Sequence, residues 1–443
     1  MNVPLRPRLT VIGTGYLGAT HAICMAMMGY DVLGVDVDAS KIEKLSAGRV
    51  PFFEPGLPEL LTKALESGRL RFTTSFAEAG EFGDIHFICV GTPQKKDSYA
   101  ADLTYVDASV TALAAHLTRK ALVVGKSTVP VGTASRLAEL IRVTAPAGDE
   151  VELAWNPEFL REGFAVDDTM KPDRMVFGVT SAWSEQQLRA AFEPVLAQGV
   201  PVKVTDLPTA ELVKVAANSF LATKISYINA MAEICEATGA DVHDLAEALA
   251  YDERIGGKFL RPGLGFGGGC LPKDIRAFTH RAEELGVGQA VGFLREIDGI
   301  NRRRRARTVD LVVELCGGSV AGKRIGALGA AFKPNSDDIR DAPALDVAAT
   351  LARMGAEVVV FDPAAMDNAR RVHPELSYGE NAFDAVRGAD VVALLTEWTE
   401  FREIEPAAMG AVVAQTKIVD GRHALDPVQW RAAGWEYRAL GRP

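Results

Sequence analysis

The stretch LTVIGTGYLGATHAICMAMMGYDVLGVD, residues 9–36, decides the fold class. A short apolar run ends in the glycines Gly13, Gly15 and Gly18, an apolar helical stretch follows, and a second apolar run ends at Asp36. Glycines at this spacing allow a tight turn and a close backbone approach to a pyrophosphate at the helix N-terminus. An acid at the end of the second strand can accept hydrogen bonds from a ribose diol and repels a 2′-phosphate. The stretch therefore predicts a dinucleotide-binding strand–helix–strand unit that takes NAD.

Further apolar runs follow at the spacing of strand–helix–strand units, and each ends in polar or turn residues, as loops at the carboxyl edge of a parallel sheet do. The first unit is also echoed later, since Met28-Gly29 with Asp36 is repeated as Met354-Gly355 with Asp362. We therefore expect an α/β protein with two Rossmann-like, doubly wound parallel-sheet domains. The runs that we expect to be strands are residues 84–90, 121–124, 151–154, 390–395 and 418–421.

The second α/β half lacks the full glycine turn. Its corresponding segment, residues 324–329, is followed by Lys333 and Arg340, and Arg422 comes later. Basic side chains without the dinucleotide turn predict an anionic ligand other than NAD.

A helical middle separates the two halves. Residues 209–238 hold no Gly or Pro and are periodic in apolar residues, which predicts a long helix that ends at Gly239. A second helical stretch, residues 291–315, contains the arginine cluster Arg302–Arg305, which we expect to form a solvated or interfacial helix face. The expected domains are a NAD-binding domain at residues 1–205, a central helical domain at 206–317 and a second Rossmann-like domain at 318–443.

Composition limits the function classes. The 443 residues, 48% of them hydrophobic, suffice for about two to four domains, and a net charge of −10 argues against a nucleic-acid scaffold or an anionic-membrane binder. No apolar run is long enough to cross a bilayer, and Met1–Pro4 leave no room for the apolar core of a signal peptide. Five scattered cysteines without a C-x-x-C pair argue against a disulfide framework or a zinc ribbon. We expect a cytoplasmic protein with no metal, no membrane contact and no nucleic-acid partner.

The segment GLGFGGGCLPKD, residues 263–274, places Cys270 after a glycine-rich loop and before a predicted helix start, with Pro272 near the first helical position. The helix dipole and Lys273 would favour the nucleophilic thiolate. The glycines beside Cys270 would be costly unless a ligand approaches, so we expect one there. The other cysteines are expected to be small packing residues, namely Cys24, Cys89, Cys235 and Cys316.

Two more pairs of polar residues have a helical spacing. Lys214 and Asn218 share one face of the long helix and could hold an alkoxide or oxyanion, and Glu158 and Glu162, in a loop after a strand, could position water. NAD accepts hydride, a thiolate traps an aldehyde, and water beside a carboxylate hydrolyses a thioester. Together these groups predict that an alcohol is oxidised twice to an acid, with two NAD per turnover.

With these motifs in order, the sequence resembles the UDP-glucose/GDP-mannose dehydrogenase family over nearly its whole length. The resemblance implies four-electron oxidation of UDP-glucose to UDP-glucuronate through an aldehyde, a cysteine thiohemiacetal and a thioester, and a C-terminal domain that binds the UDP-sugar. The matching motifs are Gly13-x-Gly15-Tyr16-x-Gly18, Gly91-Thr92-Pro93, residues 126–133, residues 156–163, Glu211-Leu212-x-Lys214 with residues 217–222, the Cys270 loop and residues 331–335.

The resemblance also implies a role for each matching residue. The catalytic residues would be Cys270 as nucleophile, Lys214 and Asn218 on the substrate oxygen, Asp274 as a helper of Lys214 and the water, Thr128 and Glu158 on the water, and Glu162 nearby. The NAD-binding residues would be Gly13, Gly15, Tyr16, Leu17, Gly18, Asp36, Lys41, Thr92, Thr128, Glu162, Lys273 and Arg340. The UDP-sugar would be bound by Glu158, Phe159, Leu160, Lys214, Asn218, Arg254, Phe259, Arg261, Gly267 and Lys333. Because Arg254 matches an arginine that reaches a neighbouring subunit's substrate, a homodimer or higher homo-oligomer is implied.

Alternatives remain for the substrate and the activity. Residues 220–226 resemble the UDP-glucose branch, but a GDP-mannose or another nucleotide-sugar 6-dehydrogenase shares the fold and the cysteine. A single-step 6-phosphogluconate-type dehydrogenase, or a non-catalytic NAD-binding protein, would leave the Cys270 loop without a use. Two departures from the family pattern, Gly269 in place of a common serine and Leu17 in place of the usual valine, bear only on substrate preference.

Overall fold

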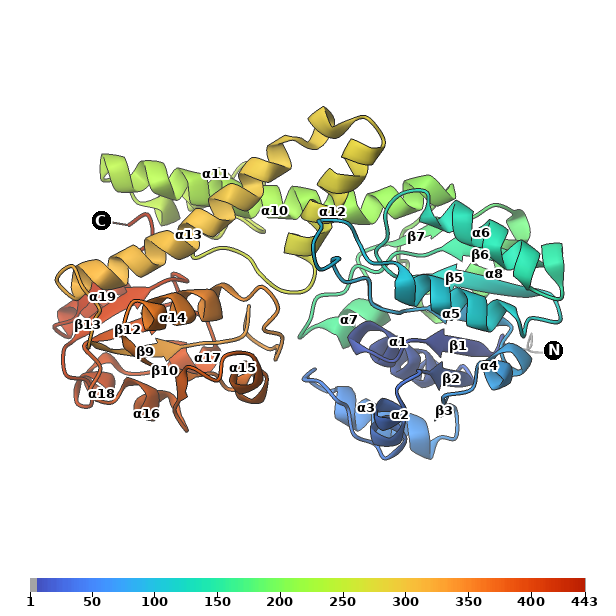
Figure 1. Cartoon of the computed structure of the whole chain (residues 1–443), viewed down its shortest axis with the longest axis horizontal. Coiled ribbons are helices and arrows are strands. Elements are labelled where there is room, and N and C mark those ends of the chain that lie inside the picture. The colour runs from blue at the N-terminus through green and yellow to red at the C-terminus, as the bar shows by residue number, and fades with distance from the viewer. Residues whose placement is uncertain (1–5, 443) are drawn as a thin grey trace. The chain divides into compact units, whose positions relative to one another are not determined.

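The computed structural model describes residues 6–442 and divides into two compact units (Figure 1). The first unit comprises residues 6–217 and 280–286, and the second comprises residues 218–279 and 287–442. Met1–Pro4, which entered the expectation that there is no signal peptide, lie outside the described residues. The division into three domains stays a prediction.

The first unit is built on an eight-stranded sheet in the order β3-β2-β1-β4-β5-β6-β7-β8. Its ladders are parallel except where β6 meets β7 at Trp155 and Gly178. The strands are β1 (Leu9–Ile12), β2 (Val32–Val35), β3 (Leu70–Thr73), β4 (Ile85–Ile88), β5 (Ala121–Gly125), β6 (Val151–Trp155), β7 (Met175–Gly178) and β8 (Val202–Thr205). The helices are α1 (Tyr16–Met27), α2 (Ala39–Ser46), α3 (Leu57–Glu66), α4 (Phe76–Phe82), α5 (Thr104–Ala114), α6 (Thr133–Thr144), α7 (Ala165–Met170), α8 (Ala182–Ala191) and α9 (Glu193–Leu196).

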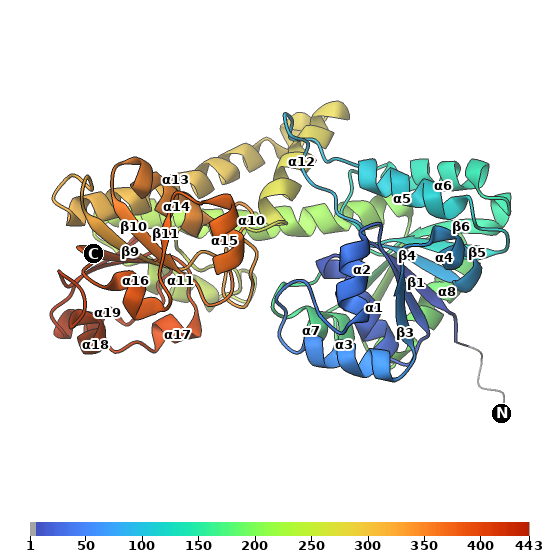
Figure 2. The same cartoon turned by 60° about the horizontal axis from the view of Figure 1, so that its bottom comes forward.

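Helices cover both faces of this sheet, so the central strands are buried on both sides (Figure 2). Leu9 and Val11 belong to a core with α1 and α3, whereas Ile12 and Val35 belong to a second core with α5 and α6. Strands buried in this way are continuous apolar runs, which is why the sequence pattern located them. The strand order reverses between β1 and β4, so the carboxyl ends of these two strands form the switch point where open α/β sheets bind ligands.

The second unit holds a six-stranded sheet in the order β11-β10-β9-β12-β13-β14, with every ladder parallel among the described residues. This order matches that of the first six strands of the first unit, so the predicted fold class of two doubly wound parallel sheets is confirmed. The strands are β9 (Arg324–Leu328), β10 (Glu357–Phe361), β11 (Ser377–Tyr378), β12 (Val391–Leu394), β13 (Lys417–Asp420) and β14 (Glu436–Ala439). The accompanying helices are α14 (Pro343–Arg353), α15 (Met366–Val372), α16 (Ala382–Val386), α17 (Thr399–Arg402), α18 (Pro406–Gly410) and α19 (Pro427–Ala432).

The predicted helical middle is present. Helix α10 (Leu207–Thr238) ends just before Gly239, which has a left-handed φ of 77°. It is followed by α11 (Val242–Ala250), α12 (Leu271–Glu284) and α13 (Phe293–Leu315). Within the part of the chain that is described, none of the helices is both apolar and long enough to span a membrane.

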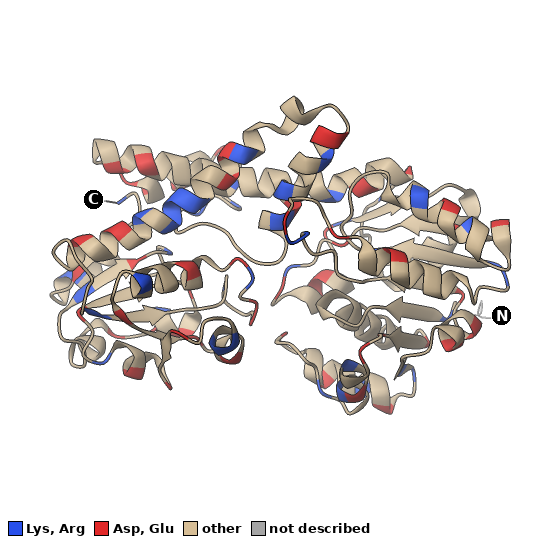
Figure 3. Cartoon of the chain, in the orientation of Figure 1, with Lys and Arg blue, Asp and Glu red and all other residues tan. Residues whose placement is uncertain are grey.

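The expectation of a solvated or interfacial face for the arginine cluster Arg302–Arg305 is wrong for two of its members. Arg302 and Arg303 are exposed, but Arg304 and Arg305 are buried in the second unit. They are neutralised by carboxylates from other elements, which a run of four like charges does not reveal. Figure 3 shows this basic stretch along α13. The ion-pair partners of the two buried arginines are Glu233 and Glu236 of α10 for Arg304, and Asp341 and Asp346 for Arg305.

Candidate active site

The predicted dinucleotide turn lies between β1 and α1. Gly13 has a left-handed φ of 89°, and a Cβ on Gly18 would lie 1.7 Å from the carbonyl oxygen of Gly13. Apart from Gly15 itself and its two chain neighbours, no heavy atom of residues 6–442 lies within 4 Å of the position of a Cβ on Gly15, so this backbone stays accessible. Helix α1 begins at Tyr16, directly after the turn. The glycines thus provide a tight turn, an open backbone and close packing, and they fit the pyrophosphate of a dinucleotide.

Asp36 follows β2, as predicted, and its side chain is only 7% exposed. One carboxylate oxygen accepts from the backbone N–H and the hydroxyl of Thr14, at 2.8 and 3.1 Å, and the other accepts from the Asp38 N–H at 3.0 Å. Lys41 lies 3.5 Å from this carboxylate. Asp36 is therefore held against the glycine turn, where a carboxylate meets the ribose of a dinucleotide.

Hydrogen bonds tie together the loops after β4, β5 and β6. Thr92 Oγ1 donates to the Thr128 carbonyl at 2.8 Å. Lys126 Nζ donates to Asn156 Oδ1 at 2.8 Å, and Asn156 in turn donates to the Val176 carbonyl at 2.9 Å. Burial lowers the pKa of Lys126 below its usual range. The carboxyl edge of the sheet therefore has a fixed polar lining, and it brings Thr92 and Thr128 together.

Glu158 and Lys214 are brought together in the first unit. Lys214 Nζ lies 3.2 Å from Glu158 Oε1, and both side chains are largely buried. The other carboxylate oxygen of Glu158 accepts from the Leu160 N–H at 2.6 Å. The Phe159 ring centroid lies 5.6 Å from Lys214 Nζ and 3.9 Å from the guanidinium carbon of Arg174. Glu158 is thus positioned both by a lysine and by its own loop.

Cys270 is the residue directly before α12. Its carbonyl accepts the Asp274 N–H at 3.0 Å, which closes the first helical turn, and Pro272 is the second helical residue. Cys270 is exposed. A thiol at this end of a helix meets the positive end of the helix dipole, which stabilises a thiolate.

A buried carboxylate lies one turn after Cys270. Asp274 accepts from Asn218 Nδ2 at 2.6 Å and from Lys273 Nζ at 2.6 Å. Asn218 is one turn after Lys214 on α10, and both side chains are buried. The second unit thus groups Asn218, Lys273 and Asp274 at the start of the helix that follows Cys270.

The glycines before Cys270 have a different cause from the expected one. A Cβ on Gly267 would lie 2.3 Å from the Asp341 carbonyl oxygen, one on Gly268 would lie 2.8 Å from the Phe332 ring, and one on Gly269 would lie 2.2 Å from the guanidinium of Arg340. The loop is glycine-rich because the protein itself packs against its backbone. Packing within the protein therefore accounts for these glycines, and no approaching ligand is needed to explain them.

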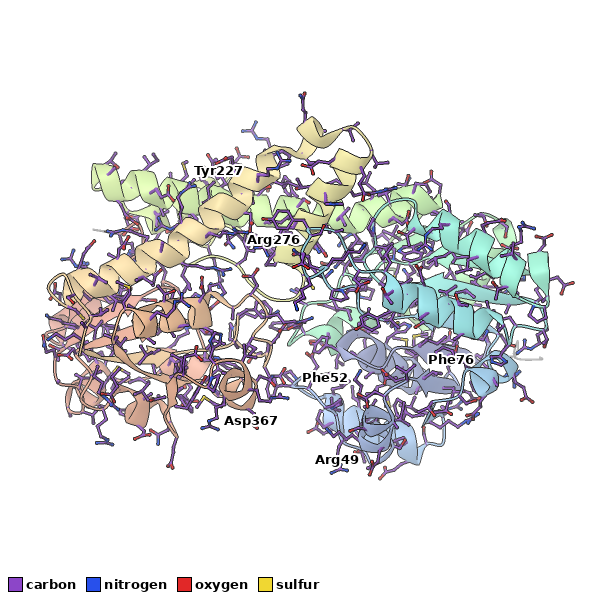
Figure 4. The ribbon with its side chains drawn as sticks, in the orientation of Figure 1. Arg49, Phe52, Phe76, Tyr227, Arg276 and Asp367 are labelled. Carbon is purple, nitrogen blue, oxygen red and sulfur yellow. The ribbon has the colours of Figure 1, made fainter. Side chains whose placement is uncertain are left out.

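Other side chains of the second unit fix the glycine-rich loop before Cys270 by hydrogen bonds. The Asn301 amide accepts from the Phe266 N–H at 2.7 Å and donates to the Phe266 carbonyl at 2.9 Å. Arg276, labelled in Figure 4, donates to Asp298 at 3.0 Å and to Asp341 at 3.1 Å. Helices α12 and α13 are thus joined to the segment that packs on Gly267.

Basic residues of the second half are engaged with the protein itself. The Arg422 guanidinium donates to the carbonyls of Leu395, Gly265 and Phe332. It therefore ties the glycine-rich loop to the C-terminal sheet, and it is not an open anion ligand.

The other predicted ligand residues lie at the surface or near it. The Arg340 guanidinium pairs with Asp338 at 2.7 Å. Lys333 Nζ lies 5.4 Å from the centroid of the Phe332 ring. The Arg254 side chain is 89% exposed and pairs with Asp252 at 2.6 Å. Exposed or half-buried positions are also occupied by Leu17, Leu160, Glu162, Phe259 and Arg261.

The remaining cysteines are packed in the protein. Cys24, Cys89 and Cys235 are buried and Cys316 is half-buried, and none of the five cysteines, all of them in the described range, forms a disulfide. Burial raises the pKa of both Cys24 and Cys89 to about 12. Their thiols are therefore inert at neutral pH, in contrast to the exposed position of Cys270.

Sequence reasoning missed several residues that support the site. Glu54, Glu211, Asn301 and Arg276 each fix a loop from a distant part of the chain. Glu211 lies in a motif that was noted without a role, and the sequence around the other three does not indicate which backbone groups they bind.

These features define a nucleotide-binding α/β dehydrogenase with a cysteine at a helix start. The chain matches three family models, which are the NAD binding domain at residues 7–196, the central domain at 208–303 and the UDP binding domain at 326–427 of the UDP-glucose/GDP-mannose dehydrogenase family. This protein belongs to that family, and NAD is its cofactor.

Known relatives are similar over most or all of their length. The UDP-glucose 6-dehydrogenase of Rhizobium meliloti (strain 1021) is 39% identical over 98% of this chain and 100% of its own, and TuaD of Bacillus subtilis (strain 168), a UDP-glucose 6-dehydrogenase, is 40% identical over 98% and 93%. Among solved structures, a UDP-glucose dehydrogenase from Pyrobaculum islandicum is 37% identical with a TM-score of 0.91, covering 100% of this chain and 99% of its own. A UDP-D-ManNAc dehydrogenase from Pyrococcus horikoshii is 26% identical with a TM-score of 0.86, covering 98% and 99%.

Proposed function

We propose that this chain oxidises UDP-glucose to UDP-glucuronate in two successive hydride transfers. One primary alcohol and one water give a carboxylate, two hydrides and three protons, so two NADH form for each sugar. The observation that carries the proposal is Cys270, an exposed cysteine directly before α12 in a chain with an NAD-binding domain. The relatives named as UDP-glucose dehydrogenases support the choice of substrate.

The cofactor fits the residues of the first unit. When it is bound, NAD supplies the hydride acceptor. The turn of Gly13, Gly15 and Gly18 would hold the pyrophosphate, and Asp36 would meet the ribose. The other expected NAD contacts are Tyr16, Leu17, Lys41, Thr92, Thr128, Glu162, Lys273 and Arg340.

In the second oxidation, the Cys270 thiolate adds to the aldehyde carbon. A C–S bond forms, and the carbonyl oxygen becomes an oxyanion that the Lys214 ammonium and the Asn218 amide stabilise. Loss of hydride from this carbon leaves a thioester. Water then attacks the thioester carbon, the C–S bond breaks, and Cys270 leaves as a thiolate.

Hydrolysis of the thioester needs a group that takes a proton from water. Glu158 is suited to this because an ionised carboxylate can accept a proton, and because Lys214 and the Leu160 N–H hold this carboxylate in place. Thr128 would orient the same water, and Asp274 would keep Asn218 and Lys273 in place through its two short hydrogen bonds.

We also propose that the protein is a homodimer or a higher homo-oligomer. Phe220, Tyr227 and Ile234 lie seven residues apart on α10 and are 67%, 50% and 57% exposed. Tyr227 is labelled in Figure 4. A stripe of large apolar side chains at this spacing is suited to packing against another helix. The exposed Arg254 would then be available to the substrate of a second copy.

We further propose that the protein acts in the cytoplasm. The mechanism requires Cys270 in its reduced form, and a reducing compartment keeps thiols reduced.

The test is the number of NADH formed per substrate. Wild type given limiting UDP-glucose should form two NADH per sugar, and Cys270→Ala should form no acid while it binds NAD+ as wild type does. One NADH per sugar, or two from the alanine variant at the wild-type rate, would refute the covalent mechanism. The same assay with GDP-mannose and UDP-N-acetylamino sugars tests the substrate, because a larger kcat/KM with one of these would reject UDP-glucose.

A further inference from the structure

A buried glutamate, Glu54, joins two parts of the first unit that are far apart in the sequence. It lies in the loop between α2 and α3 and is only 3% exposed. Its Oε1 accepts the Ala165 N–H at 2.7 Å, and its Oε2 accepts the Gly163 N–H at 2.7 Å and the Tyr16 hydroxyl. A buried carboxylate is stable only when such donors surround it, so all three contacts act on one rigid group.

The first part is the dinucleotide turn. Tyr16 is the first residue of α1 and directly follows Gly15, whose backbone is open to a pyrophosphate. Its ring lies 4.8 Å, centroid to centroid, from that of Phe52, which is labelled in Figure 4. Burial raises the pKa of Tyr16 and the Glu54 carboxylate adds to this, so the hydroxyl stays protonated and donates at any working pH.

The second part is the loop after β6. It begins at Asn156, carries Glu158, and ends at Gly163, just before α7. Glu158 is paired with Lys214 within this same unit. The Gly163 N–H also reaches the Tyr16 hydroxyl, at 3.0 Å, so the end of the loop contacts both Glu54 and Tyr16.

We propose that Glu54 is a positioning residue that couples the dinucleotide turn to residues 156–165. NAD+ that binds at the turn would restrict the motion of Tyr16. Through Glu54 this would also restrict the Gly163 and Ala165 amides, and with them the loop that carries Glu158. The effect of this coupling on sugar binding rests on the proposed function, which assigns the loop with Glu158 to the UDP-sugar and to the water. The coupling is reciprocal, so NAD+ on the turn favours the ordered loop and the ordered loop favours NAD+ on the turn.

The test is hydrogen–deuterium exchange of residues 158–166 in the full-length protein, with and without saturating NAD+. In wild type, NAD+ should slow exchange of this segment by about tenfold, since one hydrogen bond to a carboxylate is of that order. Glu54→Gln and Tyr16→Phe, each measured at an NAD+ concentration that saturates that variant, should show no NAD+-dependent change in this segment. The double variant should behave as either single variant does.

Tyr30→Phe is the matched control. Tyr30 is a buried tyrosine of the same unit whose hydroxyl donates to the Ala190 carbonyl at 2.6 Å, so its loss tests the general effect of removing such a bond. This control should keep the full NAD+-dependent protection. If Glu54→Gln also keeps it, or if wild type shows none, the coupling is refuted. Tyr16→Phe retains both backbone bonds of Glu54, so it gives a result even where Glu54→Gln fails to fold.

Steady-state kinetics separate coupling from simple stabilisation. At saturating NAD+, Glu54→Gln should raise the KM for UDP-glucose by about tenfold and change kcat less than twofold, because the sugar must then order the loop itself. A fall in kcat with an unchanged KM would contradict the inference. The exchange test uses NAD+ alone, so a wild type that shows NAD+-dependent protection but does not oxidise UDP-glucose would reject the proposed function and leave the coupling intact.

Discussion

Asn301→Ala tests whether one buried amide holds the loop that precedes Cys270. Asn301 lies on α13, is fully buried, and makes two hydrogen bonds to Phe266, at 2.7 and 2.9 Å. Loss of the two bonds costs about 1 kcal/mol each, and the buried Phe266 N–H left without an acceptor costs about 1–3 kcal/mol more. The Phe266 carbonyl keeps a donor in Arg305, at 3.2 Å. We therefore expect the free energy of unfolding of the second unit to fall by roughly 3–5 kcal/mol.

The assay is urea unfolding followed by tryptophan fluorescence, because Trp398, Trp430 and Trp435 all lie in the second unit. Asn229→Ala is the control, since this buried amide accepts one bond, from the Gly263 N–H at 2.9 Å, and its Nδ2 has no partner among the described residues. Asn229→Ala should lower the free energy of unfolding by about 1–2 kcal/mol less than Asn301→Ala does. A decrease below about 1 kcal/mol for Asn301→Ala, or one no larger than that of Asn229→Ala, would refute the reasoning.

Two further predictions concern the first unit. Gly18→Ala places a Cβ 1.7 Å from the Gly13 carbonyl oxygen, so the dinucleotide turn must shift. Overpacking of this kind typically costs about 1–3 kcal/mol, and we expect NAD+ affinity to fall by about tenfold or more. An NAD+ titration that gives the wild-type Kd would contradict this. Burial lowers the pKa of His86 to about 3, so below a pH of about 6.5 the unfolded chain binds a proton that the native protein does not. The free energy of unfolding should therefore be independent of this group above pH 6.5 and fall by about 1.4 kcal/mol per pH unit from there toward pH 3. His86→Gln should flatten that slope in urea titrations at several pH values, and an unchanged slope would show that His86 is not the group responsible.

The sequence predicts those parts of the fold and site that are local. The glycine turn, the strand before it and Asp36 lie within residues 9–36, so one short window contains the whole pattern. The same holds for Cys270 and α12, where the glycines, the proline and the helix start are neighbours in the chain. Buried parallel strands also have a local signal, because burial on both faces makes them continuous apolar runs.

Contacts between distant residues could not be predicted in this way. Glu54 is 109 positions from Gly163, and Asn301 is 35 from Phe266, and no periodicity specifies which buried polar group meets which backbone N–H. The prediction that the arginine cluster Arg302–Arg305 lies on a solvated or interfacial face was wrong for Arg304 and Arg305 for the same reason. Whether Arg304 faces solvent depends on Glu233 and Glu236, which lie on another helix.

The two echoed acids show how one sequence pattern leads to two functions. Asp36 keeps a place at an open glycine turn, with Lys41 as its charged neighbour. Asp362 is fully buried, and its carboxylate accepts five hydrogen bonds, from the N–H groups of Ala330, Ala331, Ala364 and Ala365 and from the Trp398 indole. A carboxylate offers about four lone-pair sites, so Asp362 has none left for a ribose diol. The second sheet therefore keeps the topology of a dinucleotide-binding unit while its acid serves only to fix its own turn, which agrees with the absence there of the full glycine fingerprint.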